Sequence, residues 1–193
     1  MRLIATWIAL TLTFIVPASA HPSIGSAVSF AAGVAHPLSG LDHITAMVAV
    51  GLWAAVKGRR ALWVWPLTFV TVMLVGGVLG LAQIALPFVE PGILASVVVL
   101  GLMVALAVDP PVWAGAAIIG FFALLHGHAH GAEVAPSANG LEYVAGFALA
   151  TAMLHAVGIG FGLTLQRVTP GPVNRIAGVI CVAVGAGLCA GAL

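Results

Sequence analysis

Residues 61–86 read ALWVWPLTFVTVMLVGGVLGLAQIAL, a stretch without a single charged side chain. As a helix it would be about 39 Å long, which exceeds the roughly 30 Å hydrocarbon core of a membrane. Backbone groups in lipid must be hydrogen-bonded internally, and the chain shows no alternating strands of the kind that build membrane barrels. The stretch therefore predicts a transmembrane helix.

The composition of the whole chain agrees with this prediction. Its 193 residues are 62% hydrophobic and 6% charged, with a mean hydropathy of +1.22. A soluble domain carries about 25% charged residues, so most of this surface must face hydrocarbon. The six Lys and Arg residues leave no basic footprint for nucleic acid. The phosphate-binding loop, the HExxH motif and the GxSxG motif are missing, which argues against an ATPase, a nucleotide partner, a zinc protease or a serine hydrolase.

The N-terminus has the pattern of a signal peptide. A basic residue is followed by the apolar segment Leu3–Val16 and by small residues up to Ala20. Cleavage there would remove residues 1–20 and leave residues 21–193 as a single transmembrane helical domain. His21 would then be the mature N-terminus, where its α-amino group and imidazole could chelate one metal ion together. An uncleaved first helix is the alternative.

Seven apolar runs follow, separated by prolines and charged residues. They predict an all-α integral membrane protein, a bundle of about six or seven transmembrane helices with a broken or re-entrant first segment. The runs are Ser23–Ala35, Leu41–Val56, Ala61–Leu86, Gly92–Val108, Val112–Leu125, Leu141–Gln166 and Val173–Leu193.

Basic residues in the loops predict the orientation in the inner (cytoplasmic) membrane. Lys57–Arg60 mark one cytoplasmic loop, and Arg167 and Arg175 mark another. The segment His126–Gly140 and the mature N-terminus are then expected on the periplasmic side. To connect that N-terminus to the first cytoplasmic loop, residues 23–56 must cross an odd number of times. They form either one traversal broken near residues 36–40 or a re-entrant segment followed by a span.

Histidine, with seven copies, outnumbers Lys and Arg together. An ionisable side chain inside a membrane span is costly and is a functional candidate by default. The first cluster contains His36, Asp42 and His43, with Met47 one turn beyond His43 on the same helix face. Imidazole and thioether suit first-row transition metals, and the carboxylate could coordinate, orient a ring or balance charge. Packing or a proton relay is the alternative, and core packing is an equal alternative for Met47.

The second cluster contains His126, His128, His130 and Glu133, a density of histidine that indicates metal binding. Located in a loop at the outer end of a span, it would capture ions; a solvated loop with incidental histidines is the alternative. His155 stands alone, about 21 Å into a predicted helix, and is expected near the membrane midplane. It is a candidate for the inward route or a hydrogen-bonded packing residue.

The two clusters carry a family resemblance. Residues 36–43 read H-x5-D-H, and residues 125–133 resemble the signature F-H-G-x-A-H-G-x-E, with Leu125 in place of the aromatic residue. With the leader and the His-Pro start of the mature chain, they resemble the HupE/UreJ family of nickel/cobalt permeases over essentially the whole length. The resemblance implies functional roles for the following residues: His36, Asp42, His43, His126, His130 and Glu133. His128 occupies a variable position of the signature.

The predicted function is a secondary transporter, and not an enzyme, that takes up Ni²⁺ or Co²⁺ from the periplasm. His21 and residues 126–133 would capture the ion, and His36, Asp42 and His43 would hold it at the helix break. No prosthetic group is implied; the expected partners are the ion and the lipid bilayer, with a homo-oligomer left open. Two other interpretations remain: a membrane-embedded metalloenzyme with a histidine-bound metal, and an accessory subunit that delivers metal for hydrogenase or urease maturation.

Overall fold

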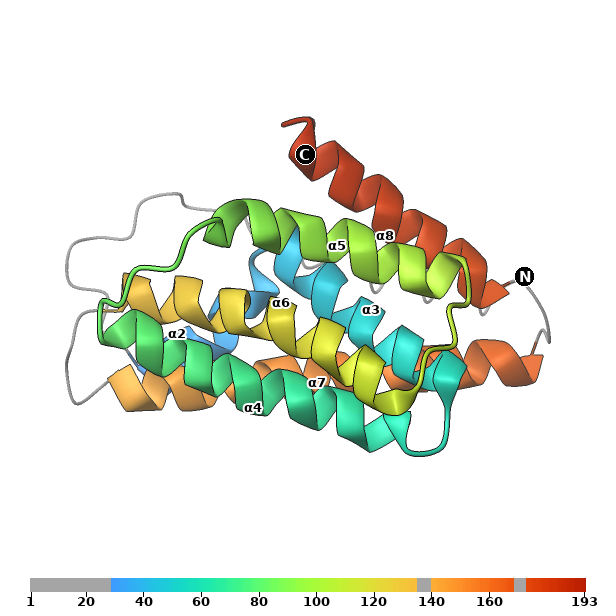
Figure 1. Ribbon diagram of the computed structural model, residues 1–193, viewed down its shortest axis with the longest axis horizontal. Coiled ribbons are helices and arrows are strands. Elements are labelled where there is room, and N and C mark those ends of the chain that lie inside the picture. The colour runs from blue at the N-terminus through green and yellow to red at the C-terminus, as the bar shows by residue number, and fades with distance from the viewer. Residues whose placement is uncertain (1–28, 135–139, 169–172) are drawn as a thin grey trace, which may run out of the picture.

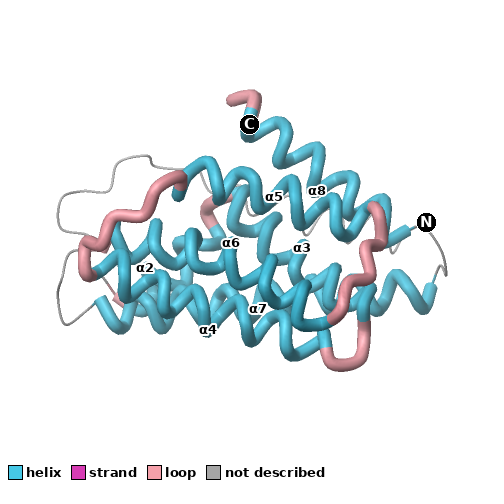
Figure 2. Tube along the Cα trace, in the orientation of Figure 1, coloured by secondary structure: helices cyan, strands magenta, loops and turns pink. Residues whose placement is uncertain are grey.

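The computed structural model describes residues 29–134, 140–168 and 173–193, and the regular structure within these ranges is entirely helical (Figure 1). The predicted signal peptide and His21 lie outside the described residues. Figure 2 shows the helices joined by short connections. The elements are α2 (Phe30–Ala35), the 3-10 helix η2 (His36–Leu38), α3 (Leu41–Lys57), α4 (Ala61–Leu81), α5 (Val89–Ala105), α6 (Val112–Glu133), α7 (Gly140–Val168) and α8 (Val173–Cys189).

The first segment is broken where the sequence predicts. Residues 30–38 and 41–57 meet at an angle of 82°. Pro37 lies in the first turn of η2, and Gly40 adopts an extended conformation just before α3 begins. Between them, the Ser39 N–H and hydroxyl both donate to the His36 carbonyl, at 3.0 and 2.6 Å. The chain thus changes direction at the break while the His36 carbonyl and the Ser39 N–H remain hydrogen-bonded. A break between membrane helices requires such bonds, because lipid offers the backbone no partner.

The helix lengths support a multi-pass membrane protein. Three helices, α4, α6 and α7, are long and apolar enough to cross a membrane alone, and the bent pair α2–α3 would be a fourth span. The helices α5 and α8 are apolar but have only 17 residues each. They are about 26 Å long, so they cross a membrane only where it is thin or locally thinned. The all-helical class is confirmed.

The two largest differences from the predicted boundaries are at the ends of α4 and α6. The helix α4 ends at Leu81 instead of Leu86, because Gln83 adopts a left-handed backbone conformation (φ 56°) and its side-chain amide donates to the Gly80 carbonyl. That bond satisfies a carbonyl at the end of the helix. The second correction concerns α6, which continues beyond Leu125 to Glu133. The residues predicted to form a periplasmic loop at 126–133 are therefore helical.

Glycine brings the backbones of α4 and α6 into direct contact. A Cβ atom on Gly76 would lie 2.2 Å from the Leu124 carbonyl oxygen, and one on Gly127 would lie 1.9 Å from the Met73 carbonyl oxygen. Neither position can carry a side chain unless the helices separate. Packing through small residues is the expected means of association in lipid, where apolar side chains gain little by leaving the solvent.

The end of the bundle near α3–α4 is closed by aromatic packing. Trp53 and Trp65 are fully buried, with ring centroids 4.4 Å apart. Their indole N–H groups donate to the carbonyls of Val108 and Val112, at 2.8 and 2.9 Å. The outer faces of the same helices are also apolar, which is typical of helices surrounded by lipid. Exposed side chains on α4 include Trp63, Leu67, Val75 and Val78.

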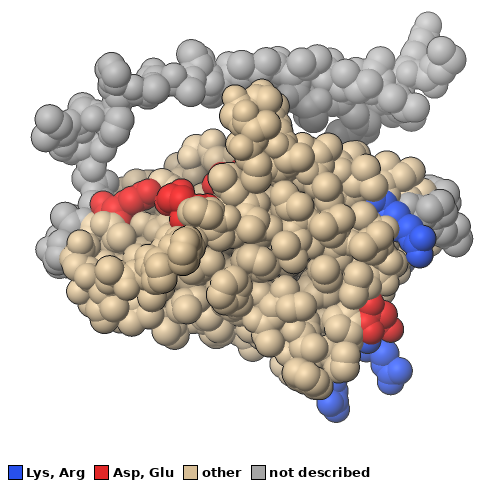
Figure 3. Space-filling model, turned by 45° about the horizontal axis from the view of Figure 1, so that its top comes forward, with Lys and Arg blue, Asp and Glu red and all other residues tan. Residues whose placement is uncertain are grey.

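Charged side chains gather at the two ends of the described bundle (Figure 3). Lys57 at the end of α3 pairs with Asp109 in the α5–α6 connection, which places these two segments at the same end. Arg59 and Arg60 form the turn before α4, Arg167 lies in the last turn of α7, and Arg175 lies in the first turn of α8. This segregation of Lys and Arg is the arrangement that the positive-inside rule requires.

We therefore expect the two ends of the bundle to face opposite sides of the membrane. In a chain without Cys181 and Cys189, single cysteines at Pro111→Cys and Glu142→Cys should react with an impermeant thiol reagent from opposite sides. Both parent residues are exposed; Pro111 immediately precedes α6, and Glu142 lies in the first turn of α7. The measurement is labelling in intact cells against labelling in inverted vesicles. Labelling of both positions from the same side would contradict the arrangement.

The close contact at Gly76 predicts that an added methyl group lowers thermal stability there but not at a glycine with open space around it. Gly76→Ala should lower the thermal midpoint of the purified protein in detergent, because the methyl group collides with the backbone of α6. Gly160→Ala is the matched control: no atom lies within 4 Å of its added Cβ, and alanine gains about 1 kcal/mol in helix propensity. Its midpoint should be equal or higher. Equal destabilisation by both substitutions would show that the α4–α6 contact is not specific.

Candidate metal centre

The second histidine cluster is part of a buried helix surface. His126, His130 and Glu133 follow one another at spacings of four and three residues, so they lie on one face of α6. His126 and His130 are buried, and Glu133 is exposed at the end of the helix. The expectation of a collecting loop is therefore wrong. The helix continues past Leu125, where the predicted apolar run ends, but one of its faces becomes polar. Mean hydropathy falls in the same way for a helix with one polar face and for a loop, so it cannot distinguish the two.

His128 is directed away from this face. Its Nε2 atom lies 2.6 Å from the Ile84 carbonyl oxygen in the α4–α5 connection. The sequence groups His128 with its two neighbours, but the helical period separates it from them. Its role as a metal ligand remains a prediction, and the structure places it outside the cluster described below.

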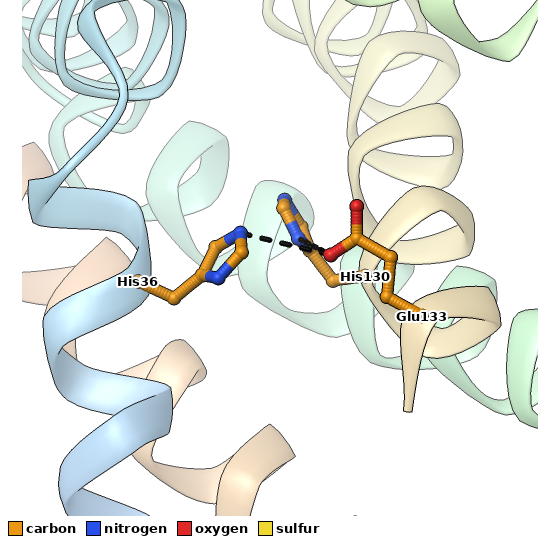
Figure 4. Close-up of side chains that lie close together, drawn as sticks. All are labelled: His36, His130 and Glu133. Carbon is orange, nitrogen blue, oxygen red and sulfur yellow. Dashed lines mark ion pairs between the residues drawn. The ribbon is translucent and has the colours of Figure 1, made fainter. Parts of the chain in front are cut away.

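The broken first segment carries His36 to the end of α6. The His36 Nε2 atom lies 3.8 Å from Glu133 Oε2, and the His130 Nδ1 atom lies 3.6 Å from the same oxygen (Figure 4). One potential ligand atom from each of the three residues falls within 4.8 Å of the others. Two nitrogens and one carboxylate oxygen at such separations form a donor set suited to a divalent transition-metal ion.

His43 joins the same group from the first turn of α3. Its Nε2 atom lies 2.5 Å from the His130 Nε2 atom. On the other side of the ring, Nδ1 lies 2.7 Å from Asp42 Oδ1. A carboxylate that accepts the N–H of a histidine fixes the tautomer and leaves the second nitrogen as a metal ligand. Asp42 therefore orients His43, one of the roles that the sequence allows.

His126 forms the innermost part of the group. It is fully buried, and its ring centroid lies 5.1 Å from that of His43. Its Nε2 atom lies 3.0 Å from the hydroxyl oxygen of Ser96, which in turn donates to the Ile93 carbonyl. A hydroxyl that donates elsewhere accepts from the imidazole, so Ser96 holds the Nε2–H tautomer of His126 and leaves Nδ1 free.

We call His36, His43, His126 and His130, with Asp42 and Glu133, the histidine cluster. Its two carboxylates supply the negative charge that a divalent ion needs in a region of low dielectric constant. Exposure falls along the cluster: the side chains of Glu133 and His36 are 58% and 37% exposed, and His126 is completely covered. An ion can thus enter from the surface at one end and reach a buried imidazole at the other.

The remaining predicted residues lie elsewhere. Met47 is fully buried in the apolar core, one turn along α3 from His43. His155 is buried against Phe69 of α4, with ring centroids 4.9 Å apart, and does not belong to the cluster. His21 lies outside the described residues.

Sequence reasoning missed several neighbours of the cluster. Ser96 is the only hydroxyl-bearing residue in α5, and this isolation within an apolar helix was a usable signal. Tyr143 and Phe147 of α7 pack against His36, and Phe147 also packs against His130, at centroid distances of 5.9, 6.1 and 4.2 Å. Aromatic residues are ordinary in membrane helices, so no sequence pattern singled these two out.

Two comparisons with known proteins match most of the chain. Residues 8–188 match the family model described as HupE / UreJ protein. The chain is also 47% identical over 176 residues to Protein HupE of Rhizobium leguminosarum bv. viciae, an alignment that covers 91% of this chain and 92% of the relative. The chain belongs to the HupE/UreJ family. No solved structure matches it significantly.

Family membership gives the two sequence motifs a common location. The H-x5-D-H element supplies the cluster residues from η2 and α3, and the second signature supplies those from α6. The two motifs of this HupE/UreJ protein are 82 residues apart between His43 and Leu125, yet they form one cluster. The resemblance that the sequence suggested is thus confirmed, and the structure shows that both motifs contribute to one cluster.

The cluster predicts metal binding that depends on a specific carboxylate. Glu133→Gln should weaken binding of Ni²⁺ to the purified protein at least tenfold, because it removes an anionic ligand near His36 and His130. Glu142→Gln is the matched control, an exposed glutamate in the first turn of α7 at the same end of the bundle. Equilibrium dialysis in detergent measures both. Equal affinities for the two variants would argue against Glu133 as a ligand.

Proposed function

We propose that this HupE/UreJ protein is a secondary transporter that takes up Ni²⁺ or Co²⁺ through the histidine cluster. The observation that supports the proposal most strongly is the meeting of four imidazoles and two carboxylates from η2, α3 and α6 inside a membrane helix bundle. Such groups are expensive to bury in a membrane protein unless they bind or conduct an ion. The nitrogen-rich donor set favours a transition metal over Mg²⁺ or Ca²⁺.

The proposed location is the inner (cytoplasmic) membrane, with the mature N-terminus in the periplasm and a cleaved signal peptide. The segregation of the basic residues supports this orientation, because it assigns the end with Lys57 to the cytoplasm. The cluster then opens towards the periplasm through Glu133 and His36. Glu133 ends α6 and lies near His36, whereas Lys57 pairs with Asp109 just before α6 begins, so the two groups lie at opposite ends of this helix. Six crossings follow if α5, α8 and the bent first segment each cross once.

Uptake in this direction needs no nucleotide. An inside-negative potential of 100 mV favours entry of a divalent ion by about 4.6 kcal/mol. This corresponds to roughly a thousandfold accumulation at equilibrium. Binding must be strong enough to replace the water of the ion and weak enough to release it, and a chain of neighbouring imidazoles with different exposure suits that requirement.

Two other functions fit part of the same geometry. A membrane-embedded metalloenzyme would use the cluster to hold a resident ion, and an accessory subunit would hand the ion to a hydrogenase or urease maturation system. The graded exposure from Glu133 to His126 favours passage of the ion over permanent retention. Transport into protein-free vesicles separates the three functions.

The decisive measurement is uptake of radioactive nickel into proteoliposomes that contain only this protein, with Co²⁺ and Zn²⁺ as competitors. We expect accumulation that depends on an inside-negative potential and is inhibited by Co²⁺ more strongly than by Zn²⁺. Tight binding without accumulation would favour the metalloenzyme or the accessory subunit.

Substitutions of the histidines test whether the uptake measured in this experiment depends on the histidine cluster. His130→Ala should lower uptake at least a hundredfold at every nickel concentration, and so should His43→Ala. The Nε2 atoms of the two imidazoles lie 2.5 Å apart, so we expect both side chains to bind the same ion. His128→Ala is the comparison on the same helix, and we expect a loss at least ten times smaller, since this side chain contacts the Ile84 carbonyl. Similar losses for His128→Ala and His130→Ala would contradict the assignment of the cluster.

A further inference from the structure

A groove on the outer surface lies between the beginnings of α4 and α6. It has a volume of about 570 Å³, within the range of roughly 300–1,000 Å³ that holds small molecules. The residues that line it are Arg60, Trp63, Val64, Val112 and Trp113. The groove is at the same end of the bundle as the Lys57–Asp109 pair, because Asp109 lies three residues before the start of α6. The histidines that α6 contributes to the histidine cluster lie towards its other end.

Two exposed tryptophans belong to the walls of the groove. Trp63 and Trp113 are 60% and 76% exposed, whereas Trp53 and Trp65 are fully buried. The buried indoles donate their N–H groups to backbone carbonyls, but the indoles of Trp63 and Trp113 have no acceptor among the described residues. Exposed tryptophan is typical of the membrane interface, where its ring contacts lipid and its N–H group contacts polar headgroups. The two indoles thus offer hydrogen-bond donors to a molecule outside the chain.

Arg60 adds a positive charge to the groove. It is exposed, and none of the ion pairs among the described residues includes it. Of the five acidic residues, which all lie in the described part of the chain, Asp109 is the one at this end, and it pairs with Lys57. A guanidinium can bind a phosphate group through two parallel N–H bonds. An arginine beside two indole donors is therefore suited to an anionic phosphate ester.

The groove lies at the boundary between the hydrocarbon core and the lipid headgroups. The 21 residues of α4 form a helix of about 31 Å, which just spans a hydrocarbon core of roughly 30 Å. Arg60 immediately precedes this helix and is therefore at the level of the headgroups. Leu67, about two turns further along α4, is 55% exposed and is at the level of the acyl chains. The groove thus combines polar donors for a headgroup with an apolar helix face beneath them.

We propose that this groove binds the headgroup of an anionic phospholipid. The Arg60 guanidinium and the indole N–H groups of Trp63 and Trp113 bind its phosphate oxygens, and its acyl chains lie along the outer face of α4. A zwitterionic headgroup would place a cation next to Arg59 and Arg60, which is unfavourable, so the groove selects a lipid with net negative charge. The bound lipid connects the beginnings of α4 and α6. The site involves no metal ion and is independent of the transport function proposed above.

The experiment measures lipid binding to the purified full chain in detergent by native mass spectrometry. Phosphatidylglycerol and phosphatidylcholine with identical acyl chains are added separately, and the native chain is compared with Arg60→Gln. Arg175→Gln is the matched control, because it removes the same charge from an exposed arginine at the same end of the bundle, in the first turn of α8 and outside the groove. The thermal midpoint without added lipid shows whether each variant is folded.

We expect the native chain and Arg175→Gln to bind phosphatidylglycerol at least fivefold more tightly than phosphatidylcholine. Arg60→Gln should bind phosphatidylglycerol about fivefold more weakly than the native chain does, the effect of one basic residue at an anionic membrane surface. Equal weakening by the two substitutions would show that only net charge matters and would overturn the site. Equal affinities of the native chain for the two lipids would overturn the choice of an anionic lipid.

Inorganic phosphate is added as a competitor, and we expect it to leave the bound phosphatidylglycerol in place. Displacement of the lipid at equal concentration would identify a general anion site and overturn the assignment of a lipid. Trp113→Leu tests the same groove if Arg60→Gln does not fold, because it removes one indole N–H group from an exposed side chain. It should weaken phosphatidylglycerol binding at least threefold with an unchanged thermal midpoint. Unchanged lipid affinity in this variant would contradict the role of the groove.

Discussion

The lipid environment offers the backbone no hydrogen-bond partner, and every other feature of the molecule depends on this constraint. It explains why the described residues are helical and why the break between α2 and α3 is closed by the Ser39 bonds to the His36 carbonyl. It also makes each buried polar side chain expensive. The imidazoles are therefore concentrated where the first segment breaks, and most of the remaining interior is apolar.

Close helix contact positions the polar face of α6. Backbone packing against α4 at Gly76 and Gly127 determines the rotation of α6 about its axis, so His126 and His130 face His43, and His128 faces the Ile84 carbonyl. A methyl group at this contact would change stability and also displace the ligands. The glycines of this helix contact thus contribute to the geometry of the candidate metal centre.

The cluster combines neutral nitrogen ligands with carboxylates at its edges. Asp42 orients His43 and Glu133 faces the exterior, so negative charge lies close to the imidazole nitrogens without enclosing them completely. Aromatic packing around Trp53 and Trp65 closes the opposite half of the bundle. Under the proposed transport function, the ion enters this conformation from one side, and its release on the other side requires these helices to move relative to one another.

The sequence alone was sufficient to predict the helical membrane class, the break near residues 36–40 and the family, because hydropathy, proline and motif spacing are local properties. It also identified the cluster residues by their chemistry. Only the tertiary structure decided which of them meet. The expected loop at 126–133 is a helix, since a span with one polar face loses its hydropathy signal without losing its backbone hydrogen bonds. The separation of His128 from His130, the role of Ser96 and the groove between α4 and α6 depend on the packing of neighbouring helices, which no single segment of the sequence contains.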